Sequence, residues 1–465
     1  MPNSNLVDKK KFENANEILG KVKRIHFVGI GGAGMCALAE ILYNRGFELS
    51  GSDVNESETL ARIKKLGIPV VMQHLAENIN GAELVVHTAA VHNDNVELMA
   101  ARQFNIPVME RAELLGIISS EYTKTIAVSG THGKTTTTSM ITQILVMAGL
   151  DPTAIIGGKL PFIGGNSRVG KSEIMVCEAC EFVDSFLHLR PTISLILNID
   201  KDHMDYFKTL ENLIEHFTMF TDFTSETVIF NGDDINTLKA IEKTKLSRIT
   251  FGLDENNDIY AKDIFTNGNS MHEFDVIYKN NKFTHIALSV PGKHNVLNAL
   301  AACAAAICVG ASADDIQRGL NSFTGAGRRF EILGTINGIT IADDYAHHPT
   351  ELKLTLEAAK QMKYNRVWAV FQPFTFSRTV MLMDEFVKAL SIADKVVLAE
   401  IMGSREINTY NVYSKDLAEK IPGSVWFESF EQIARFIIEN AKSGDLVITL
   451  GCGDIYKAAK MMLNA

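Results

Sequence analysis

Ile126–Thr138 reads Ile-Ala-Val-Ser-Gly-Thr-His-Gly-Lys-Thr-Thr-Thr-Thr and passes from an apolar run through two glycines into a helical pattern that extends to about Met147. A strand, a tight glycine loop and a helix start form a cradle for phosphate, because backbone N–H groups and the helix dipole face the anion. Lys134 can reach outer phosphates, and Thr135 can offer its hydroxyl to Mg²⁺. We therefore expect the phosphates of ATP at Gly130, Thr131, His132, Gly133, Lys134, Thr135 and Thr136.

The spacing of this loop is unusual. In the common form, Gly-x4-Gly-Lys-Ser/Thr, a glycine would stand where this chain has Val128. The alternative interpretation is an ordinary glycine-rich turn before a helix. That alternative gives no purpose to a Gly-Lys-Thr run directly after a strand, so we favour phosphate binding.

Length and charge limit the class of protein. A chain of 465 residues predicts about three domains. The formal net charge of −10 argues against a nucleic-acid partner. Met1–Gly20 lacks the apolar segment of a signal peptide, and the sequence has no apolar run of about 18 residues. We expect a soluble cytoplasmic protein without a membrane partner.

Cys177 and Cys180 form a Cys-x-x-Cys motif, which is found in zinc and redox sites. The sequence has no second Cys or His pair at zinc spacing. Reduced thiols of a cytosolic protein are therefore the favoured interpretation.

The first third of the chain has a second glycine loop. The predicted strand Lys23–Val28 is followed by Gly-Ile-Gly-Gly-Ala-Gly and an apolar helix to about Tyr43. These glycines allow close approach of a pyrophosphate, and Asp53, after the predicted strand Glu48–Ser52, is placed for a ribose hydroxyl. The predicted diphosphate site is Gly29, Gly31, Gly32, Gly34 and Asp53. A nicotinamide dinucleotide fits this pattern too, and a purely structural turn is the remaining alternative.

The β/α alternation continues and predicts a doubly wound parallel sheet that ends near Ser120. In the middle of the chain, polar clusters follow the predicted strands Glu173–Cys177 and Thr192–Asn198. Ligands bind beyond the carboxyl ends of strands in such sheets, so these carboxylates could hold Mg²⁺. His203, in the second cluster, could instead be a hydrogen-bonding residue at a helix start.

Further along, Asp258–Leu288 predicts alternating short strands, and an alanine-rich helix follows Pro291, with Asn295 and Asn298 near its start in need of partners. The last third again alternates β and α. The run Asp343–Glu351 after a predicted strand places two aspartates and two histidines within six residues. One helix is predicted from Ser377–Thr379 to about Leu390, and Gly451-Cys452-Gly453 is interpreted as a strand-to-helix turn rather than a phosphate site.

Several motifs, in the same order, resemble those of the Mur ligases, the ATP-dependent amide-forming enzymes of peptidoglycan precursor synthesis. The matching runs are Gly130–Thr138, His26–Met35, Arg328–Glu331, Asp343–Glu351, Phe371–Pro373 and Ser377–Thr379. The resemblance covers the chain from about Arg24 to Lys457 and is strongest to members that join L-alanine to UDP-N-acetylmuramate. It implies an α/β protein of three domains: a Rossmann-like UDP-binding domain at 1–120, a central P-loop ATPase domain at 121–325, and a Rossmann-like closing domain at 326–465.

Carried over residue by residue, the resemblance implies that Gly29–Gly34 holds the UDP diphosphate rather than NAD. It also implies two Mg²⁺ ions: Glu178 would bind the first and His203 the second, and Thr135 would bind Mg²⁺ beside the ATP phosphates. Asn295 and Asn298 would face adenine, and Arg329 and Asp344 would contact the nucleotide. The implied catalytic residues are Lys134, His203, Arg329 and His348. Many relatives carry Asp at the position of Cys180 and His at that of Phe374, so the resemblance assigns these two positions no role.

The implied substrates are UDP-N-acetylmuramate, L-alanine and ATP, with Mg²⁺ as cofactor, in a monomer or weak homodimer. The nearest alternative is a recycling ligase that attaches a murein tripeptide to the same UDP-sugar. A sister ligase that adds glutamate or a diamino acid fits the N-terminal motif less well. From other classes, a nicotinamide-dependent oxidoreductase and a P-loop switch stay open, although the first leaves Gly130–Thr138 unexplained.

Overall fold

The computed structural model describes residues 9–404 and 406–465, which form two compact units. The first unit comprises Met1–Gly157, Phe162–Phe251 and Ala301–Ser312, and the second comprises Gly158–Pro161, Gly252–Leu300 and Ala313–Ala465. The units interleave along the chain, so the predicted domain boundaries after residues 120 and 325 stay predictions. The prediction that Met1–Gly20 is not a signal peptide falls partly outside the described residues, which begin at residue 9. None of the described helices is long and apolar enough to cross a membrane.

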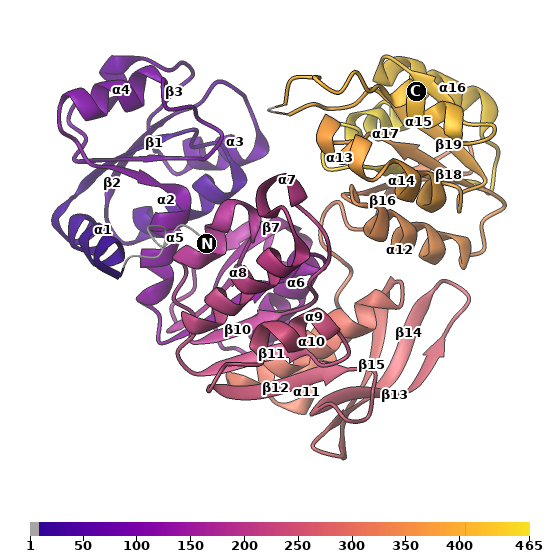
Figure 1. Cartoon of the computed structure of the whole chain (residues 1–465), viewed down its shortest axis with the longest axis horizontal. Helices are drawn as coiled ribbons and strands as arrows, with labels where there is room; N and C mark the ends of the chain where they lie inside the picture. Colours follow the sequence, from indigo (N-terminus) through magenta and orange to yellow (C-terminus); the bar gives the residue numbers. More distant parts are fainter. Residues whose placement is uncertain (1–8, 405) are drawn as a thin grey trace. The chain divides into compact units, whose positions relative to one another are not determined.

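The first unit begins with a five-stranded parallel sheet in the order β3-β2-β1-β4-β5 (Figure 1). Its strands are β1 (Arg24–Val28), β2 (Glu48–Ser52), β3 (Val70–Val71), β4 (Leu84–His87) and β5 (Val108–Glu110). The helices are α1 (Lys9–Lys21), α2 (Ala33–Asn44), α3 (Glu58–Lys65), η2 (Ala76–Ile79), α4 (Val96–Gln103) and α5 (Arg111–Ser120). This confirms the predicted doubly wound parallel sheet.

Both faces of this sheet are covered. In β1, Ile25 and Phe27 belong to one buried cluster, which includes residues of α2 and α5, whereas Val28 belongs to another, which includes residues of α4. Alternate side chains of a strand point to opposite faces, so a strand buried on both faces is mostly apolar, although β1 also contains the buried His26. The sequence analysis missed α5 because Leu114, Leu115, Ile117 and Ile118 leave it no polar stripe to mark an amphipathic helix.

The same unit contains a second set of strands in the order β12-β11-β10-β6-β9-β7-β8, and the neighbours from β12 to β9 pair in parallel. These strands are β6 (Lys124–Ser129), β7 (Thr153–Leu160), β8 (Gly165–Arg168), β9 (Ile174–Glu178), β10 (Ile193–Ile196), β11 (Thr227–Asn231) and β12 (Ser247–Gly252). The accompanying helices are α6 (Lys134–Met147), η3 (Pro161–Ile163), η4 (Phe182–His188), α7 (Met204–Phe207), α8 (Leu210–Asp222) and α9 (Ile235–Ile241). Because β6 lies between β9 and β10, the loops that follow these three strands meet at one edge.

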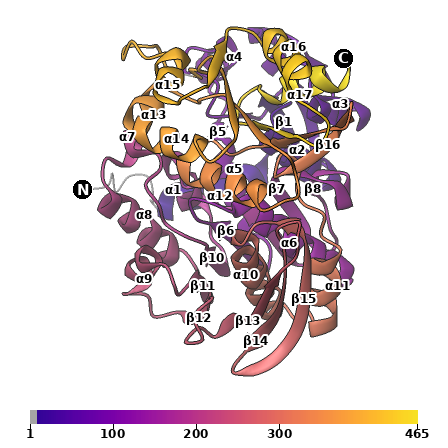
Figure 2. The same ribbon diagram turned by 90° about the vertical axis from the view of Figure 1, so that its right-hand side faces the viewer.

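The second unit contains three antiparallel strands, β13 (Ile259–Thr266), β14 (Met271–Tyr278) and β15 (Asn281–Pro291), which lie side by side in Figure 2. They confirm the predicted β region at Asp258–Leu288. The alanine-rich helix α10 (His294–Cys308) follows, and α11 (Ala313–Asn321) packs on β15.

A six-stranded sheet completes this unit in the order β16-β17-β21-β18-β19-β20. The antiparallel hairpin of β16 (Glu331–Ile336) and β17 (Ile339–Asp344) forms one edge. The other strands are β18 (Val367–Phe371), β19 (Lys395–Ala399), β20 (Val425–Phe427) and β21 (Leu446–Leu450). The helices are α12 (Pro349–Lys360), α13 (Phe376–Met381), α14 (Met383–Leu390), α15 (Ser414–Lys420), α16 (Phe430–Asn440) and α17 (Tyr456–Leu463).

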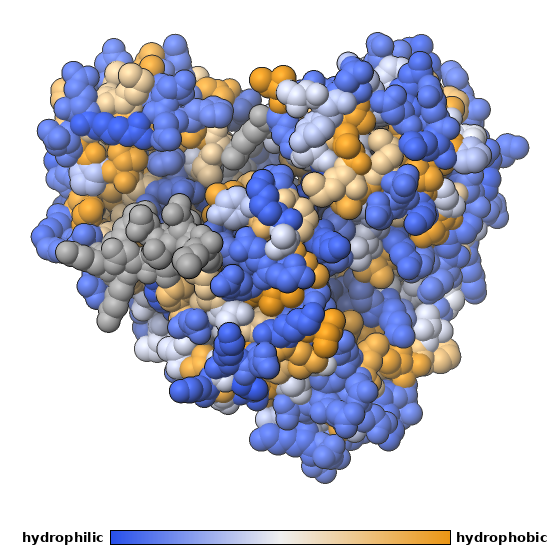
Figure 3. Space-filling view, in the orientation of Figure 1, coloured by the Kyte–Doolittle hydropathy of each residue, from blue (hydrophilic) through white to orange (hydrophobic). Residues whose placement is uncertain are grey.

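Strand β18 shows how this sheet is buried. Val367, Ala369 and Phe371 pack in a cluster with α12 and α14, while Trp368 and Val370 pack in a cluster with α16 and α17. The central strand therefore has a continuous apolar run, as expected for a sheet covered on both faces. On the face of the molecule in Figure 3, hydrophilic residues predominate and hydrophobic ones are scattered among them.

Two predictions in this region were wrong. The single helix expected to reach Leu390 is two helices, because Leu382 leaves helical angles at φ −114° and ψ 23°. This break lets α14 bury Phe386, Ala389 and Leu390 in the core. In addition, β17 continues to Asp344, so Asp343 and Asp344 lie within the strand rather than after it.

Candidate active site

The loops after β6, β9 and β10 begin side by side. Ser129 at the end of β6 pairs with Ile196 of β10, and Val128 pairs with Glu178 at the end of β9. Side chains that follow these strands therefore gather at the carboxyl edge of the sheet, where α/β proteins bind ligands. Both polar clusters noted in the sequence are brought to this edge.

The glycine loop after β6 has the backbone that its sequence predicts. Gly130 has φ +131°, and a side chain there would place Cβ 2.9 Å from Cβ of Leu197 and 3.1 Å from the backbone nitrogen of Asn198. Gly133 has φ +86° at the N-cap of α6, whose first residue is Lys134. Glycine suits position 130 because a side chain there would clash, and it suits position 133 because the backbone there is left-handed.

Asn198 holds this loop in place. Its side-chain oxygen accepts a hydrogen bond from the backbone N–H of His132 at 2.8 Å, and its side-chain nitrogen donates to the carbonyl of His132 at 3.0 Å. The Asn198 carbonyl also accepts from the N–H of Thr131 at 3.0 Å. The sequence analysis did not identify Asn198, although a polar residue that ends an apolar strand was a usable signal.

Lys134 forms a buried ion pair. Its Nζ donates to both carboxylate oxygens of Glu181, at 2.9 and 3.1 Å, and to the carbonyls of Gly130 and Thr131. The two side chains are 15% and 2% exposed. Burial alone would lower the pKa of Lys134, but the Glu181 carboxylate outweighs it and raises that pKa above its ordinary value. The lysine is thus a fixed positive charge at the loop.

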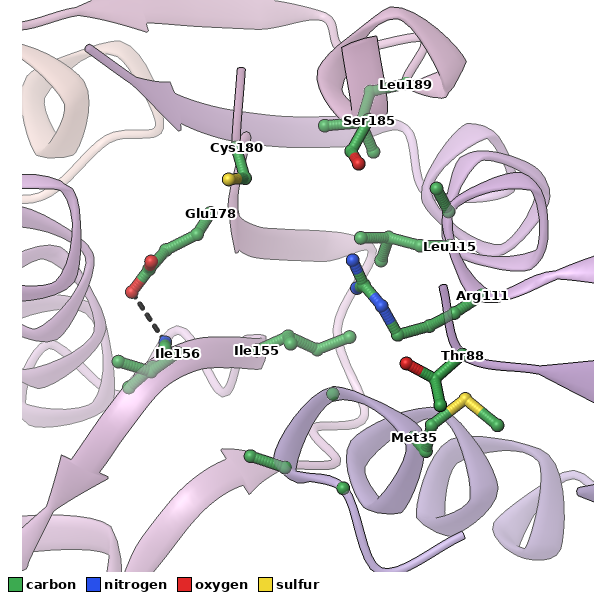
Figure 4. A pocket seen from close by; sticks show the side chains of 15 residues that line it. Met35, Thr88, Arg111, Leu115, Ile155, Ile156, Glu178, Cys180, Ser185 and Leu189 are labelled. Atoms are coloured by element: carbon green, nitrogen blue, oxygen red, sulfur yellow. Dashed lines mark hydrogen bonds between the residues drawn. The ribbon is translucent and has the colours of Figure 1, made fainter. Parts of the chain in front are cut away.

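Glu178 extends from the end of β9 toward the neighbouring strand β7. Its Oε1 accepts a hydrogen bond from the N–H of Gly157 at 2.5 Å (Figure 4). A side chain at Gly157 would bring Cβ within 2.5 Å of the carboxylate, so the glycine makes room for it. Thr135 lies in the first turn of α6 and is buried. The Thr135 hydroxyl and the Glu178 carboxylate are hard oxygen donors, so they fit Mg²⁺, which takes few protein ligands.

His203 precedes the short helix α7 and has φ +54°. Its ring packs on Phe182 with 4.6 Å between ring centroids, and its Nε2 lies 3.7 Å from a carboxylate oxygen of Asp202. The alternative prediction, a side chain that hydrogen-bonds at the helix start, was wrong, because His203 makes no such capping bond. The left-handed backbone directs the ring onto Phe182 instead.

A cavity of about 300 Å³ connects Glu178 with the start of α2. Its wall includes Gly32–Met35, the first turn of α5 and the middle of β7. In Figure 4, Arg111 and Glu178 lie on opposite sides of it. The sequence analysis missed Arg111, which directly follows a strand and thus occupies a position typical of ligand-binding residues.

The first glycine loop borders a second cavity, of about 620 Å³. Gly29 has φ +81°, and the N–H of Gly31 donates to Oδ2 of Asp53 at 2.8 Å. Asp53 also accepts from the N–H groups of Val54 and Asn55. The predicted loop residues and Asp53 are therefore brought together, and Asp53 shapes the loop; its contact with a ribose stays a prediction.

His74 lines this second cavity and is held from behind by Glu97. The fully buried Glu97 carboxylate accepts from Nδ1 of His74 and from the Ser52 hydroxyl, both at 2.7 Å, and from Nδ2 of Asn78 at 2.6 Å. Burial opposes ionisation, but hydrogen bonds from His26 and these three groups lower the pKa of Glu97 below its ordinary value. Neither His74 nor Glu97 was identified from the sequence.

The remaining predicted residues belong to the second unit. Asn298 Nδ2 donates to Oδ1 of Asn295 at 3.0 Å, and Asn295 Nδ2 donates to the carbonyl of Pro291 at 2.7 Å. Both side chains are buried. The two asparagines were predicted to need hydrogen-bond partners, and the bond between them supplies one for each.

Arg329, Asp344 and His348 lie around the start of the C-terminal sheet. Asp344 accepts from the N–H of Phe330 at 2.8 Å and from that of Ala346 at 2.7 Å. Burial raises the pKa of Asp344 to about 6, although the positive charge of Arg329 opposes this. His348 is the N-cap of α12, where its Nδ1 accepts from the N–H of Thr350 at 3.3 Å. Its predicted catalytic role stays a prediction beside this structural one.

Three family models match consecutive parts of the chain: the Mur ligase family catalytic domain at residues 24–123, the Mur ligase middle domain at 128–306, and the Mur ligase glutamate ligase domain at 328–453. A UDP-N-acetylmuramate–L-alanine ligase from Acetivibrio thermocellus is 47% identical over 451 residues, which are 96% of each chain. The chain belongs to the Mur ligase family.

Other relatives agree with this membership. A UDP-N-acetylmuramate–L-alanine ligase from Caldanaerobacter subterraneus is 44% identical over 452 residues, or 96% of this Mur ligase and 98% of the relative. The solved UDP-N-acetylmuramate–alanine ligase from Thermotoga maritima superposes with a TM-score of 0.81 at 29% identity, covering 95% of this chain and 98% of that one. A murein peptide ligase from Psychrobacter arcticus, with the same coverage, gives 0.74 at 26% identity.

Proposed function

We propose that this Mur ligase joins L-alanine to the carboxylate of UDP-N-acetylmuramate at the expense of ATP. The observation that carries the proposal is the cavity between the first glycine loop and Glu178, whose strand β9 pairs with β6, the strand before the second glycine loop. A sugar carboxylate whose UDP group is held at Gly29–Gly34 can enter this cavity. The high identity to two L-alanine ligases supports this substrate pair.

The proposed reaction has two steps. The carboxylate oxygen attacks the γ-phosphorus of ATP and releases ADP, which converts a poor electrophile into an acyl phosphate. The amine of L-alanine then attacks the acyl carbon, and the tetrahedral intermediate expels phosphate as the amide forms. Such chemistry depends mainly on positioning and on stabilising negative charge.

The residues of the first unit have separate tasks in this proposal. Lys134 binds the outer phosphates of ATP, for which it must exchange part of its contact with Glu181. Arg111 orients the sugar carboxylate from its side of the cavity. Asn198 keeps the phosphate loop rigid, so the N–H groups need little rearrangement during the reaction.

Thr135, Glu178 and His203 would hold Mg²⁺, which would neutralise charge on the phosphate oxygens. We also propose that Asn295 and Asn298 contact adenine, that Arg329 and Asp344 contact the nucleotide, and that His348 contacts the substrate. A cytoplasmic location and a monomer or weak homodimer remain predictions. Membership of the Mur ligase family argues against the nicotinamide-dependent alternative.

Mass spectrometry of the products tests the proposal. The enzyme is incubated with ATP, Mg²⁺ and UDP-N-acetylmuramate, with and without L-alanine, and phosphate release is followed in parallel. We expect UDP-N-acetylmuramoyl-alanine and one phosphate per product molecule only when every substrate is present. If ATP is hydrolysed at the same rate with and without the sugar and the amino acid, the proposal is wrong.

A separate competition experiment tests the alternative of a recycling ligase, because the chain also superposes on a murein peptide ligase. In competition between L-alanine and the tripeptide L-alanyl-γ-D-glutamyl-diaminopimelate at equal concentration, we expect the alanine product to dominate. A dominant tripeptide product would instead select the recycling activity.

A further inference from the structure

The two loops that carry Glu178 and His203 contain strained backbone. Val183 has φ 51° and ψ 37°, and Asp184 has φ 59° and ψ 19°. His203 and Lys208, which flank α7, have φ 54° and 68°. Left-handed angles at residues other than glycine are unfavourable and persist only when the surroundings enforce them. Val183 is a particularly clear case, because β-branched residues rarely adopt this conformation.

One buried carboxylate, that of Asp184, joins these loops. Its side chain is 2% exposed. Oδ2 accepts a hydrogen bond from the hydroxyl of Tyr206 in α7, and Oδ1 is bonded to Nδ1 of His216 in α8, both at 2.5 Å. The two oxygens of one carboxylate thus fix two helices relative to the segment after β9.

Backbone hydrogen bonds connect Asp184 and its partner Tyr206 to residues of the proposed active site. The N–H of Asp184 donates to the carbonyl of Glu181, the partner of Lys134, at 3.0 Å. The N–H of Tyr206 donates to the carbonyl of His203 at 2.9 Å. The Phe182 ring, two residues before Asp184, packs on the His203 ring. Asp184 therefore ties Glu181 and Phe182 on one loop to His203 on the other.

We propose that Asp184 is a positioning residue, whose hydrogen bonds to Tyr206 and His216 hold the strained segments in the geometry that His203 needs to bind a divalent cation. This inference rests on the proposed function only in assigning His203 to the cation. The phenol of Tyr206 suits the task, since its hydroxyl donates directly to the buried Asp184 carboxylate. Outer partners of metal ligands typically change metal affinity 10–100-fold when substituted.

The test compares Asp184→Asn and Tyr206→Phe with Glu40→Gln. Tyr206→Phe removes one hydrogen bond and is the milder change, in case Asp184→Asn does not fold. Glu40 is a matched control in the same unit: it is also buried and is bonded to Arg62 and Ser167, with no bond to either strained loop among its described contacts. Mn²⁺ binding to the full chain with a non-hydrolysable ATP analogue is measured by electron paramagnetic resonance, and stability by urea unfolding.

We expect both loop variants to raise the Kd for Mn²⁺ by roughly 10-fold or more, whereas Glu40→Gln loses stability without changing that Kd. We also expect high Mn²⁺ to restore much of kcat, with the KM for the UDP-sugar nearly unchanged. Loop variants that lose stability but bind Mn²⁺ like wild type would overturn the inference while leaving the ligase proposal intact. If the loop variants bind Mn²⁺ more weakly and the wild type forms no alanine product, the inference would be upheld and the ligase proposal would be wrong.

Discussion

The turn after β1 and the turn after β6 share a backbone plan: a buried parallel strand, a glycine with left-handed φ and a helix start. Their chemistry differs. In the first turn the N–H of Gly31 is bonded to the Asp53 carboxylate, and Gly29–Gly34 contains no lysine. In the second, Lys134 adds a cation that is paired with Glu181.

In the proposed function, the strand–glycine–helix pattern specifies where a phosphate binds, while the residues at neighbouring strand ends decide which phosphate is bound. The first turn has polar neighbours from the segments after β3 and β5, namely His74 and Arg111, which lie far from it in sequence. The second turn supplies its own charge. The first thus suits a diphosphate that is only held, and the second suits one whose terminal phosphoryl group is transferred.

Lys134→Ala should have the largest effect and should act on the second turn alone. We expect kcat to fall roughly 10³-fold, because the charge on the transferred phosphoryl group loses its main protein cation. The affinity for UDP-N-acetylmuramate, measured by calorimetry, should stay the same. Because the substitution leaves Glu181 buried without its cation, Lys134→Met/Glu181→Gln is the control that removes both charges. Retained turnover in either variant would contradict the assignment of the loop.

Gly31→Ala should damage the first turn alone. A Cβ at this position would lie 2.8 Å from Oδ2 of Asp53, so either the loop or the Asp53 carboxylate that holds it must shift. We expect the KM for the UDP-sugar to rise by about 10- to 100-fold, since small displacements of a binding loop have effects of that size. Gly20→Ala meets no atom within 4 Å and serves as the control. An increase in the KM for ATP of the same size would show that the two turns are not independent.

Asp344 extends the comparison to a third glycine turn, Gly451–Gly453, whose groups are used inside the protein: Arg328 donates to the carbonyl of Gly451, and the N–H of Gly451 donates to the carbonyl of Asp344. The pKa of Asp344, about 6 in the folded protein against 3.8 ordinarily, is raised. The folded state therefore binds this proton first, and ionised Asp344 costs stability above pH 6. As the pH falls from 6 to 4, the free energy of unfolding of wild type should rise relative to that of Asp344→Asn by up to about 3 kcal/mol.

The sequence offers a convenient probe for this measurement. Trp368 and Trp426, the two tryptophans of the chain, both lie in strands of the C-terminal sheet, β18 and β20. Urea unfolding followed by tryptophan fluorescence at several pH values therefore reports on this sheet. A stability difference between wild type and Asp344→Asn that does not change with pH would refute the raised pKa.

Glu181→Gln should have the smallest effect and would sharpen the contrast between the turns. Loss of the carboxylate charge releases Lys134 from a strong partner. We expect ADP in the presence of a chelator to bind several-fold more tightly than to wild type, because the phosphate no longer competes with Glu181. Equilibrium dialysis measures this affinity. Unchanged binding of metal-free ADP would mean that the ion pair does not restrain the lysine.

Much of the fold could be predicted from the sequence because its signals are local. The two glycine turns and the strand β2 each depend on a few neighbouring residues. The helices α13 and α14 were predicted as one, since Leu382 is itself a good helix former and only the packing of Phe386 requires the break. Strand ends were less certain for a similar reason, as with Asp344.

The candidate site was harder to predict because it depends on strand order. Asn198 reaches the phosphate loop only because β10 lies beside β6, and Glu181 reaches Lys134 only because β9 lies on the other side. The local sequence does not show which strands lie next to β6 in the sheet. The same holds for Glu97, which meets His74 across 23 positions of the chain. Family resemblance supplied Glu178 and His203, but neither the resemblance nor local patterns supplied Asp184.

The ion pair between Lys134 and Glu181 has a consequence for how nucleotide and cation cooperate. A phosphate that takes Lys134 leaves a carboxylate buried without a counterion, which is unfavourable unless another cation arrives. Binding of the nucleotide and of a divalent ion should therefore be thermodynamically linked, and the linkage is reciprocal: each tightens the other by the same factor. Discrimination against nucleotides without a metal ion would then reside in the charge balance of the protein rather than in the shape of its loop.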